Sequence, residues 1–281
     1  MFVPSLHEIE KTVATLWMNR EAREWLLGGR KGEMPAVLAE APAEVLAQVD
    51  QKGVDLYGSL ISFGHHDVME SVYPFCSELL GCGWHDVVED YLVKFPPDHY
   101  NFNRLCARLS QYFSLYGEEL VAKYPFLPEL ADYEWIELEK MDEETEIVVY
   151  PHEQLVSPEQ IAGWYPLVNP TLSLRDYKYN VLKIGERIKS GKKLGKIKPE
   201  RTLVASYRHP QLHEGHFAEI GEVAAKIVDI ARTPTTYASL IPQLVALTPS
   251  LSPQESVTQF LELVEDLQEL GIFVGSRKIE E

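Results

Sequence analysis

Apolar side chains in the first half of the chain recur at the spacing of an α-helix. Ser5 and Glu8 have the spacing of a capping box, and apolar residues then follow at intervals of three and four as far as Gly28. A second apolar stripe begins at Trp84 and stops before Phe95. Because similar patterns fill the intervening sequence, residues 1–145 are predicted to form an all-helical domain.

Pro74 interrupts this helical pattern. It has no backbone N–H and crowds the preceding turn, so the helix that runs through Val68 and Val72 must kink or restart there. Gly81 and Gly83 are predicted to end the continuation.

The period of the pattern changes after about residue 145. Runs rich in β-branched and aromatic residues are typical of strands. They are EIVVYP (146–151), TLSLRDYKY (171–179) and TLVASYRH (202–209). Pro210 and Gly215 then indicate a hairpin. Its return strand is predicted to include His216, Phe217 and Ala218.

Helical patterns and one short strand complete the chain. The predicted helices cover residues 220–231, 237–245 and 253–270, and the strand is IFV at 272–274. The last helix has the clearest start, with a capping box at Ser252 and Glu255 and a proline between them. The predicted fold class is therefore α+β: the all-helical domain, followed over residues 146–281 by an α+β domain similar to a winged helix.

Composition and charge narrow the possible functions. The chain has 281 residues, of which 45% are hydrophobic, enough for roughly two packed domains. Its net charge of -17 repels phosphate, so nucleic-acid binding is not expected without a segregated basic face. Residues 183–201 hold eight basic and two acidic residues, and their glycines predict a loop. Residues 129–146 hold nine acidic residues and one lysine, typical of a solvated linker or helix face. Whether the basic loop and the acidic run over 137–146 are ordered stays open.

The chain shows neither an export signal nor an apolar run of membrane-spanning length. Its three cysteines are odd in number and do not resemble a disulfide framework. A cytoplasmic location without membrane contact is therefore expected.

Candidate metal ligands and nucleophiles are densest between residues 63 and 92. They are His65, His66, Cys76, Cys82 and His85. Their spacing matches no zinc pattern, and the i, i+4 pair of His66 and Glu70 has no second pair to complete a site. Cys82 could be an activated thiol beside His85, but a Gly-Cys-Gly helix terminator accounts for it equally well. Nucleotide-binding and serine-nucleophile motifs are also lacking. No catalytic residue, metal or other cofactor is predicted.

The composition of the helix after Ser252 favours peptide binding over DNA binding. A recognition helix needs basic or amide side chains to read a major groove, whereas this helix is acidic and apolar. A free strand edge beside an apolar helix instead suits an extended peptide. The predicted peptide-binding residues are His216, Phe217 and Ala218 on the strand and Val257, Phe260, Leu261 and Val264 on the helix. Part of this helical stripe must be core, and the pattern leaves open which part.

Several short motifs of the first half occur in the order found in one known family. They are Tyr73-Pro74, Leu80-Gly81, Trp84, Tyr91, Phe95-Pro96-Pro97, Leu127-Pro128-Leu130-Ala131 and Glu134-Trp135. With them the chain resembles the HvfC/BufC-like family, whose name refers to a DNA-binding domain. The order of the strands and helices after residue 165 resembles the C-terminal half of the same proteins.

The resemblance implies a partner protein. Members of this family form complexes with multinuclear non-heme iron-dependent oxidative enzymes that modify cysteine-containing ribosomal peptides. By resemblance, the chain is a non-catalytic subunit of a heterodimer, and its C-terminal half is similar to a precursor-peptide recognition element. The leader peptide would add to the strand at 215–219 against the helix at 257–264, and the enzyme would supply any iron ligands. Two alternatives stay open: a DNA-binding transcriptional regulator and a stand-alone metalloenzyme.

Overall fold

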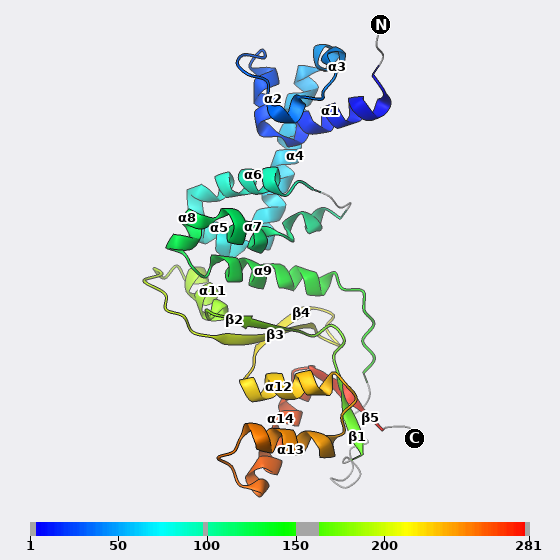
Figure 1. The fold of residues 1–281 in the computed structure, drawn as a ribbon, viewed down its shortest axis with the longest axis vertical. Helices are drawn as coiled ribbons and strands as arrows, with labels where there is room; N and C mark the ends of the chain where they lie inside the picture. Colours follow the sequence, from blue (N-terminus) through cyan, green and yellow to red (C-terminus); the bar gives the residue numbers. More distant parts are fainter. Residues whose placement is uncertain (1–3, 98–100, 150–162, 279–281) are drawn as a thin grey trace. The chain divides into compact units, whose positions relative to one another are not determined.

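The computed structural model describes residues 4–97, 101–149 and 163–278. The fold is mixed α+β, with a helical N-terminal part and small antiparallel sheets in the C-terminal part (Figure 1). Contacts divide the chain into two compact units, Met1–Ala131 and Asp132–Glu281. This division falls inside helix α9 (Leu127–Met141), before the boundary expected at residues 145/146.

The described residues of the first unit form helices joined by short connections. The helices are α1 Leu6–Met18, α2 Arg20–Leu27, η1 Ala36–Leu38, α3 Ala43–Gln48, α4 Gln51–Val72, α5 Pro74–Leu80, η2 Gly81–Gly83, α6 Trp84–Lys94, η3 Phe102–Cys106, α7 Leu109–Tyr116, α8 Glu118–Lys123 and the start of α9. The predicted helical character of this part is confirmed.

The first predicted helix is divided into α1 and α2. Its capping box is present: the Glu8 N–H donates to Ser5 Oγ at 3.3 Å, and the Ser5 N–H donates to the Glu8 carboxylate at 2.7 Å. Asn19 then takes an extended conformation with ψ 113°, and its side chain accepts a hydrogen bond from the Ala22 N–H at 2.9 Å. Asparagine is among the best N-caps, so the chain ends one helix and starts another here.

Pro74 ends α4 and begins α5, as predicted. The preceding residue, Tyr73, is fully buried, and its hydroxyl donates to the Cys106 carbonyl oxygen at 2.5 Å. The hydroxyl of Tyr91 donates in the same way to the Leu105 carbonyl oxygen at 2.5 Å. Two tyrosines of the family-like motifs therefore hold η3 against the surrounding helices.

The second unit contains both sheets and the remaining helices. Its elements are β1 Trp164–Val168, β2 Ser173–Tyr177, α11 Val181–Lys189, β3 Thr202–Arg208, β4 Gly215–Glu219, α12 Glu222–Ala231, α13 Tyr237–Leu247, α14 Pro253–Glu269 and β5 Phe273–Lys278. The predicted strands at 171–179, 202–209 and 272–274, the hairpin and the three helices after it are confirmed, with small differences at their ends.

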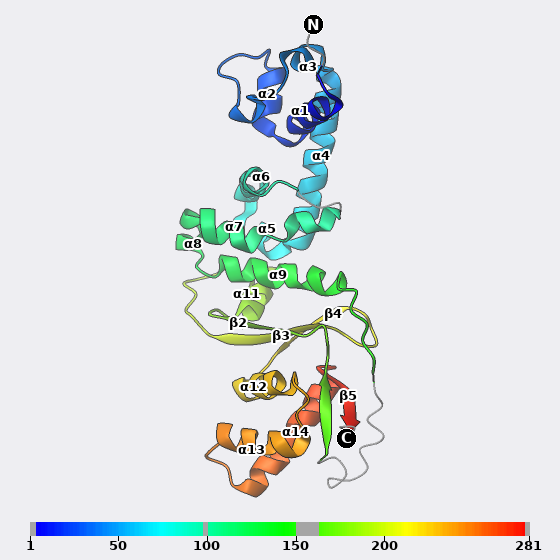
Figure 2. The same cartoon turned by 45° about the vertical axis from the view of Figure 1, so that its right-hand side comes forward.

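Strands β2, β3 and β4 form one antiparallel sheet in that order. Figure 2 shows the C-terminal part of α9 and α11 on one face of this sheet and α12 to α14 on the other. Tyr207 of β3 faces helices α12 to α14, because it belongs to the same core cluster as Ile227 and Phe260. Side chains alternate along a strand, so Ser206 and its partner Phe217 face α9.

Two strands form a second sheet that the pattern only partly indicated. β1 pairs with β5 in antiparallel register, with Trp164 opposite Lys278. Pro166 lies within β1. Proline is rare in strands, so the sequence pattern does not predict a strand there.

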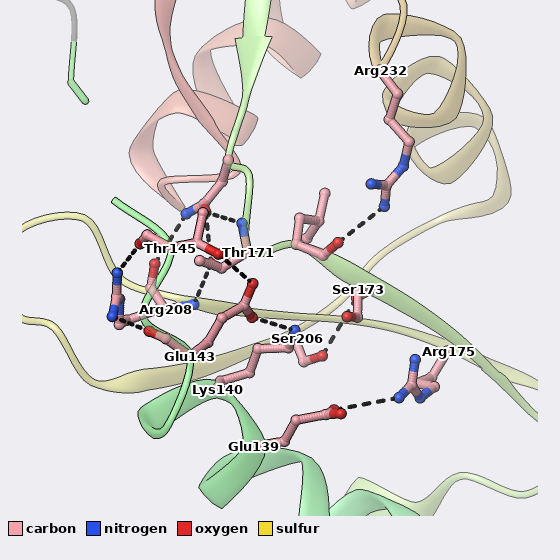
Figure 3. Close-up of polar contacts among 12 residues, drawn as sticks. Glu139, Lys140, Glu143, Thr145, Thr171, Ser173, Arg175, Ser206, Arg208 and Arg232 are labelled. Atoms are coloured by element: carbon pink, nitrogen blue, oxygen red, sulfur yellow. Dashed lines mark hydrogen bonds and ion pairs between the residues drawn. The ribbon is translucent and has the colours of Figure 1, made fainter. Parts of the chain in front are cut away.

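The segment predicted as a strand at 146–151 is irregular over residues 146–149, and Tyr150 and Pro151 lie outside the described residues. The preceding residues are held by a side chain. The Arg208 guanidinium donates to the carbonyl oxygens of Glu143 and Thr145 (Figure 3). The prediction of a strand over residues 146–149 was therefore wrong: backbone groups just before them bond to an arginine rather than to a neighbouring strand.

The basic segment is not a loop over its whole length. Residues up to Lys189 form α11, whose N-cap Asn180 accepts a hydrogen bond from the Lys183 N–H at 3.1 Å. Ile184 and Ile188 are buried one turn apart, so apolar packing outweighs the presence of Gly185 in the helix.

Each unit has its own apolar core. The first includes Leu16, Leu26, Leu38 and Val54, and the second includes Tyr207, Ile227, Leu240, Phe260 and Phe273. None of the helices in the described ranges is both long enough and apolar enough to cross a membrane.

Candidate functional site

Strand β4 forms an open edge of the three-stranded sheet. Among the described residues it pairs with β3 alone, and Phe217 lies opposite Ser206. The Ile220 N–H donates to the Leu203 carbonyl oxygen at 3.0 Å. Because the bonds of an antiparallel pair alternate, the backbone N–H and C=O groups of Phe217 and Glu219 point away from β3. Within the described residues, no backbone hydrogen bond reaches these outward groups.

Helix α9 lies beside this edge on one face of the sheet. The ring centroids of Phe217 and Tyr133 are 5.0 Å apart. Gly215 approaches α9 so closely that a β-carbon there would lie 3.1 Å from a backbone oxygen of the helix. His216 and Ala218 point to the opposite face, where Ala218 packs on the core of the α12 to α14 layer. All three predicted residues of β4 are half-buried.

The predicted residues of α14 lie in two environments. Phe260 and Val264 are 1% and 7% exposed and belong to the core. Val257 and Leu261 are 40% and 42% exposed and face solvent. α14 packs against α13 and β5, whereas the ring beside Phe217 comes from α9. A peptide groove between β4 and α14 stays a prediction, and the role of α9 was not foreseen.

Carboxylates surround the open edge. Glu219 belongs to β4, and Glu214 lies just before it. Burial raises the pKa of the Tyr133 hydroxyl, and the nearby carboxylates of Glu137 and Glu134 raise it further. Carboxylates in these positions favour cationic groups along the edge.

The other edge of the sheet, β2, carries ion pairs. Arg175 Nε lies 3.2 Å from Asp132 Oδ2. Its Nη2 lies 3.6 Å from Glu139 Oε2 (Figure 3). Asp176 accepts two hydrogen bonds of 2.8 Å from Arg201. These ion pairs tie the β2 side chains to α9 and to Arg201.

A separate group of polar side chains lies between α4 and α6 in the first unit. His66 Nε2 is 2.9 Å from Glu89 Oε1, and the rings of His66 and His85 stack with centroids 4.2 Å apart. The potential ligand atoms of all three residues lie within 4.8 Å of one another. Ser62 Oγ donates to Glu89 Oε1 at 3.1 Å. The hydrogen bond with His66 is the main cause that lowers the pKa of Glu89 to about 2.

Glu89 was not among the predicted ligands, so this group was not predicted. A usable signal was present, since His85 and Glu89 are an i, i+4 pair on α6. The other candidates of that stretch lie elsewhere: His65 is 4% exposed and stacks on Phe102, and Cys76 is buried.

The three cysteines are free thiols. Cys82 is exposed in η2, whereas Cys76 and Cys106 are buried. Burial raises the pKa of Cys106 to about 12, so this thiol is not activated.

The basic segment lines a groove beside α11. The groove has a volume of about 400 Å³ between α11 and residues 196–200. Lys183, Arg187, Lys196 and Lys198 line it together with Glu200, which lies 2.5 Å from Lys183. This is a positive surface on a chain with a net charge of -17.

No family model and no curated protein matches the chain. The candidate sites are therefore assigned from geometry, burial and charge.

Proposed function

We propose that the chain is a non-catalytic partner subunit that binds the leader segment of a ribosomal precursor peptide and presents it to a multinuclear non-heme iron-dependent oxidative enzyme. The observation that carries the proposal is the open edge of β4, where the backbone groups of Phe217 and Glu219 point outward. An extended peptide that pairs with such an edge gains main-chain hydrogen bonds whatever its sequence. Side-chain contacts then select among peptides.

The proposed fold of the peptide-binding part is winged-helix-like. The order of its elements, β2, α11, β3 and β4 followed by α12 to α14, supports it. In this proposal β4 is the third strand and receives the peptide. α9 adds a wall that contains Tyr133, and the exposed Val257 and Leu261 offer apolar surface on α14.

The chemistry of the edge favours a basic peptide with apolar side chains at alternate positions. Alternate side chains of an added strand would face Tyr133 and Phe217, which suits apolar groups. Glu214, Glu219 and Glu137 favour lysine or arginine nearby.

The sequence resemblance supports the oxidative enzyme as the partner. The motifs that carry the resemblance lie mostly in the first unit, so this unit is proposed to dock the enzyme. Tyr73 and Tyr91 each donate a hydrogen bond to η3, so they hold this part of the first unit in place.

Glu219→Pro tests strand addition directly. The substitution removes an outward N–H without removing a bond to β3. Glu219→Ala removes the same carboxylate but keeps the N–H, so it is the matched control. With a fluorescent leader peptide from a precursor gene found near this one, the proline variant should bind about tenfold more weakly than the alanine variant. Equal affinities of the two variants would exclude peptide addition at β4.

Purification tests the second part of the proposal. Coexpressed with a multinuclear non-heme iron oxidative enzyme found in its gene neighbourhood, the chain should elute as a heterodimer whose iron belongs to the enzyme. The isolated chain should not turn over the precursor peptide. Turnover by the isolated chain would support the stand-alone metalloenzyme instead.

Nucleic-acid binding is the second candidate function, favoured by the groove of Lys183, Arg187, Lys196 and Lys198. Contacts of this kind read phosphates and lose affinity steeply as salt rises. A mobility-shift titration of wild type and Lys196→Glu/Lys198→Glu at several salt concentrations decides the matter. A salt-dependent shift that the double variant abolishes would support a DNA-binding regulator.

A further inference from the structure

We propose that His66, His85 and Glu89 form a binding site for one divalent transition-metal ion of the zinc class. This inference goes beyond the proposed function and does not depend on it. The three side chains come from two helices, His66 from α4 and the other two from α6. Their potential ligand atoms already lie within 4.8 Å of one another.

The distances are close to those that a zinc ion requires. At zinc–ligand distances of about 2.1 Å, the ligands of a tetrahedral site lie about 3.4 Å apart. His66 Nε2 and Glu89 Oε1 are separated by 2.9 Å, so an ion would push these two atoms apart by a few tenths of an ångström. His85 is exposed, so its ring can turn toward the ion without disturbing the core.

The elements that carry these ligands are fixed by packing. α4 buries Met69 completely, and α6 buries Val88 and Tyr91 completely in the same unit. His85 and Glu89 are one turn apart on α6, which places both side chains on one face of that helix. Ligands on packed helices keep their separation, which lowers the cost of assembling a site.

A second residue orients the carboxylate. Ser62 Oγ donates to Glu89 Oε1 at 3.1 Å from one turn before His66 on α4. Hydrogen bonds of this kind to a metal ligand are typical of metal sites, where they fix the direction of the ligand. The low exposure of the His66 and Glu89 side chains, 17% and 21%, limits competition from water.

The set of donors indicates the class of ion. Two imidazole nitrogens and one carboxylate oxygen suit zinc and its neighbours in the first transition row better than magnesium or calcium. Three protein ligands leave a fourth position open. Water or a side chain of another protein can occupy that position.

The experiment is a metal titration of the untagged full-length chain after removal of metals with a chelator. The affinity and stoichiometry of zinc binding are measured by calorimetry, and the visible absorption of bound cobalt reports the coordination. Wild type should bind one equivalent. His85→Ala and Glu89→Gln should weaken binding by about 100-fold or more, and Ser62→Ala by about tenfold. Since His85 is exposed, its variant should fold normally, which circular dichroism checks.

The matched control is His209→Ala. His209 lies against His216 in the second unit, and the centroids of the two rings are 4.6 Å apart. This variant should bind zinc like wild type. Absence of stoichiometric binding by wild type, or binding that survives both His85→Ala and Glu89→Gln, would overturn the proposal.

Discussion

Asn169 Nδ2 donates a hydrogen bond of 3.1 Å to the carbonyl oxygen of Gly271, 102 positions further along the chain. The same nitrogen donates to the Arg208 carbonyl oxygen at 3.0 Å. Asn169 Oδ1 accepts from the backbone N–H and the hydroxyl of Thr171 at 3.0 and 2.7 Å. One fully buried amide therefore joins the link between β1 and β2, the end of β3 and the turn before β5.

Asn169→Ala should lower the free energy of unfolding by about 3 kcal/mol, because it leaves buried backbone groups without partners. Asn19→Ala, which removes the N-cap of α2 near the surface, should cost about 1 kcal/mol. Urea denaturation measures both. A loss for Asn169→Ala no larger than that for Asn19→Ala would show that the junction is not held by this amide.

Gly271→Ala should destabilise the protein more than Gly191→Ala. Both glycines have positive φ, 76° and 64°, where a side chain is strained at a cost of about 1 kcal/mol. At Gly271 a β-carbon would also lie 2.9 Å from Pro210 Cδ, whereas at Gly191 it would meet no atom within 4 Å. The difference between the two melting temperatures measures the close contact alone, and equal melting temperatures would contradict it.

His209 should titrate below the ordinary value of 6.5, because burial and then the neighbouring His216 lower its pKa. The unfolded chain therefore binds the proton more readily, so this residue reduces stability as pH falls below about 6.5. In an NMR titration, His216→Asn should raise the pKa of His209 but leave part of the depression, since burial is the larger cause. A pKa at or above 6.5 in wild type would contradict this expectation.

Cys82 should react with a thiol reagent in the native protein, whereas Cys76 and Cys106 should react only after unfolding. Cys82 is exposed, the other two are buried, and the pKa of Cys106 is raised to about 12. Mass spectrometry after brief alkylation at pH 8 identifies the labelled residue. Native Cys82→Ser should take up no label, and labelling of that variant would contradict the burial of the other two.

Phe260→Ala should cost about 3 to 5 kcal/mol of unfolding free energy, because the ring is 1% exposed in the core. Leu261 is the next residue and is 42% exposed, so Leu261→Ala should change the unfolding free energy by no more than about 0.5 kcal/mol. Leu261→Asp then tests the predicted peptide site without loss of the core, since a fall in peptide affinity with unchanged stability assigns Leu261 to that site. Similar destabilisation by both alanine substitutions would contradict the orientation of α14.

Features fixed by neighbouring residues could be predicted from the sequence. The capping boxes at Ser5 and Ser252 need a partner three residues away, and both form. The break at Pro74 depends on the proline itself. The β3–β4 hairpin follows from strand patterns that flank a short turn. In each case the decisive interaction lies within a few positions of the residues that reveal it.

Features fixed by distant contacts could not be predicted. Tyr133 meets Phe217, and Glu89 meets His66, only after elements far apart in sequence have packed. Arg208 holds residues 143–145 from the far end of β3, which no local pattern near residue 146 reveals. In the candidate site, the strand was found from its pattern, but the neighbouring wall of α9 depends on tertiary packing.

The open edge of β4 could cause self-association, which the net negative charge of the chain opposes. An unpaired edge can pair with the same edge of a second copy as well as with a peptide. Two copies of a chain with a net charge of -17 repel each other as they approach, and Glu214 and Glu219 bring that repulsion to the edge itself. Electrostatic range shrinks from about 8 Å at physiological salt to about 3 Å at 1 M. Raising the salt concentration should therefore favour dimers joined through β4, which makes ionic strength the variable to control during concentration and storage.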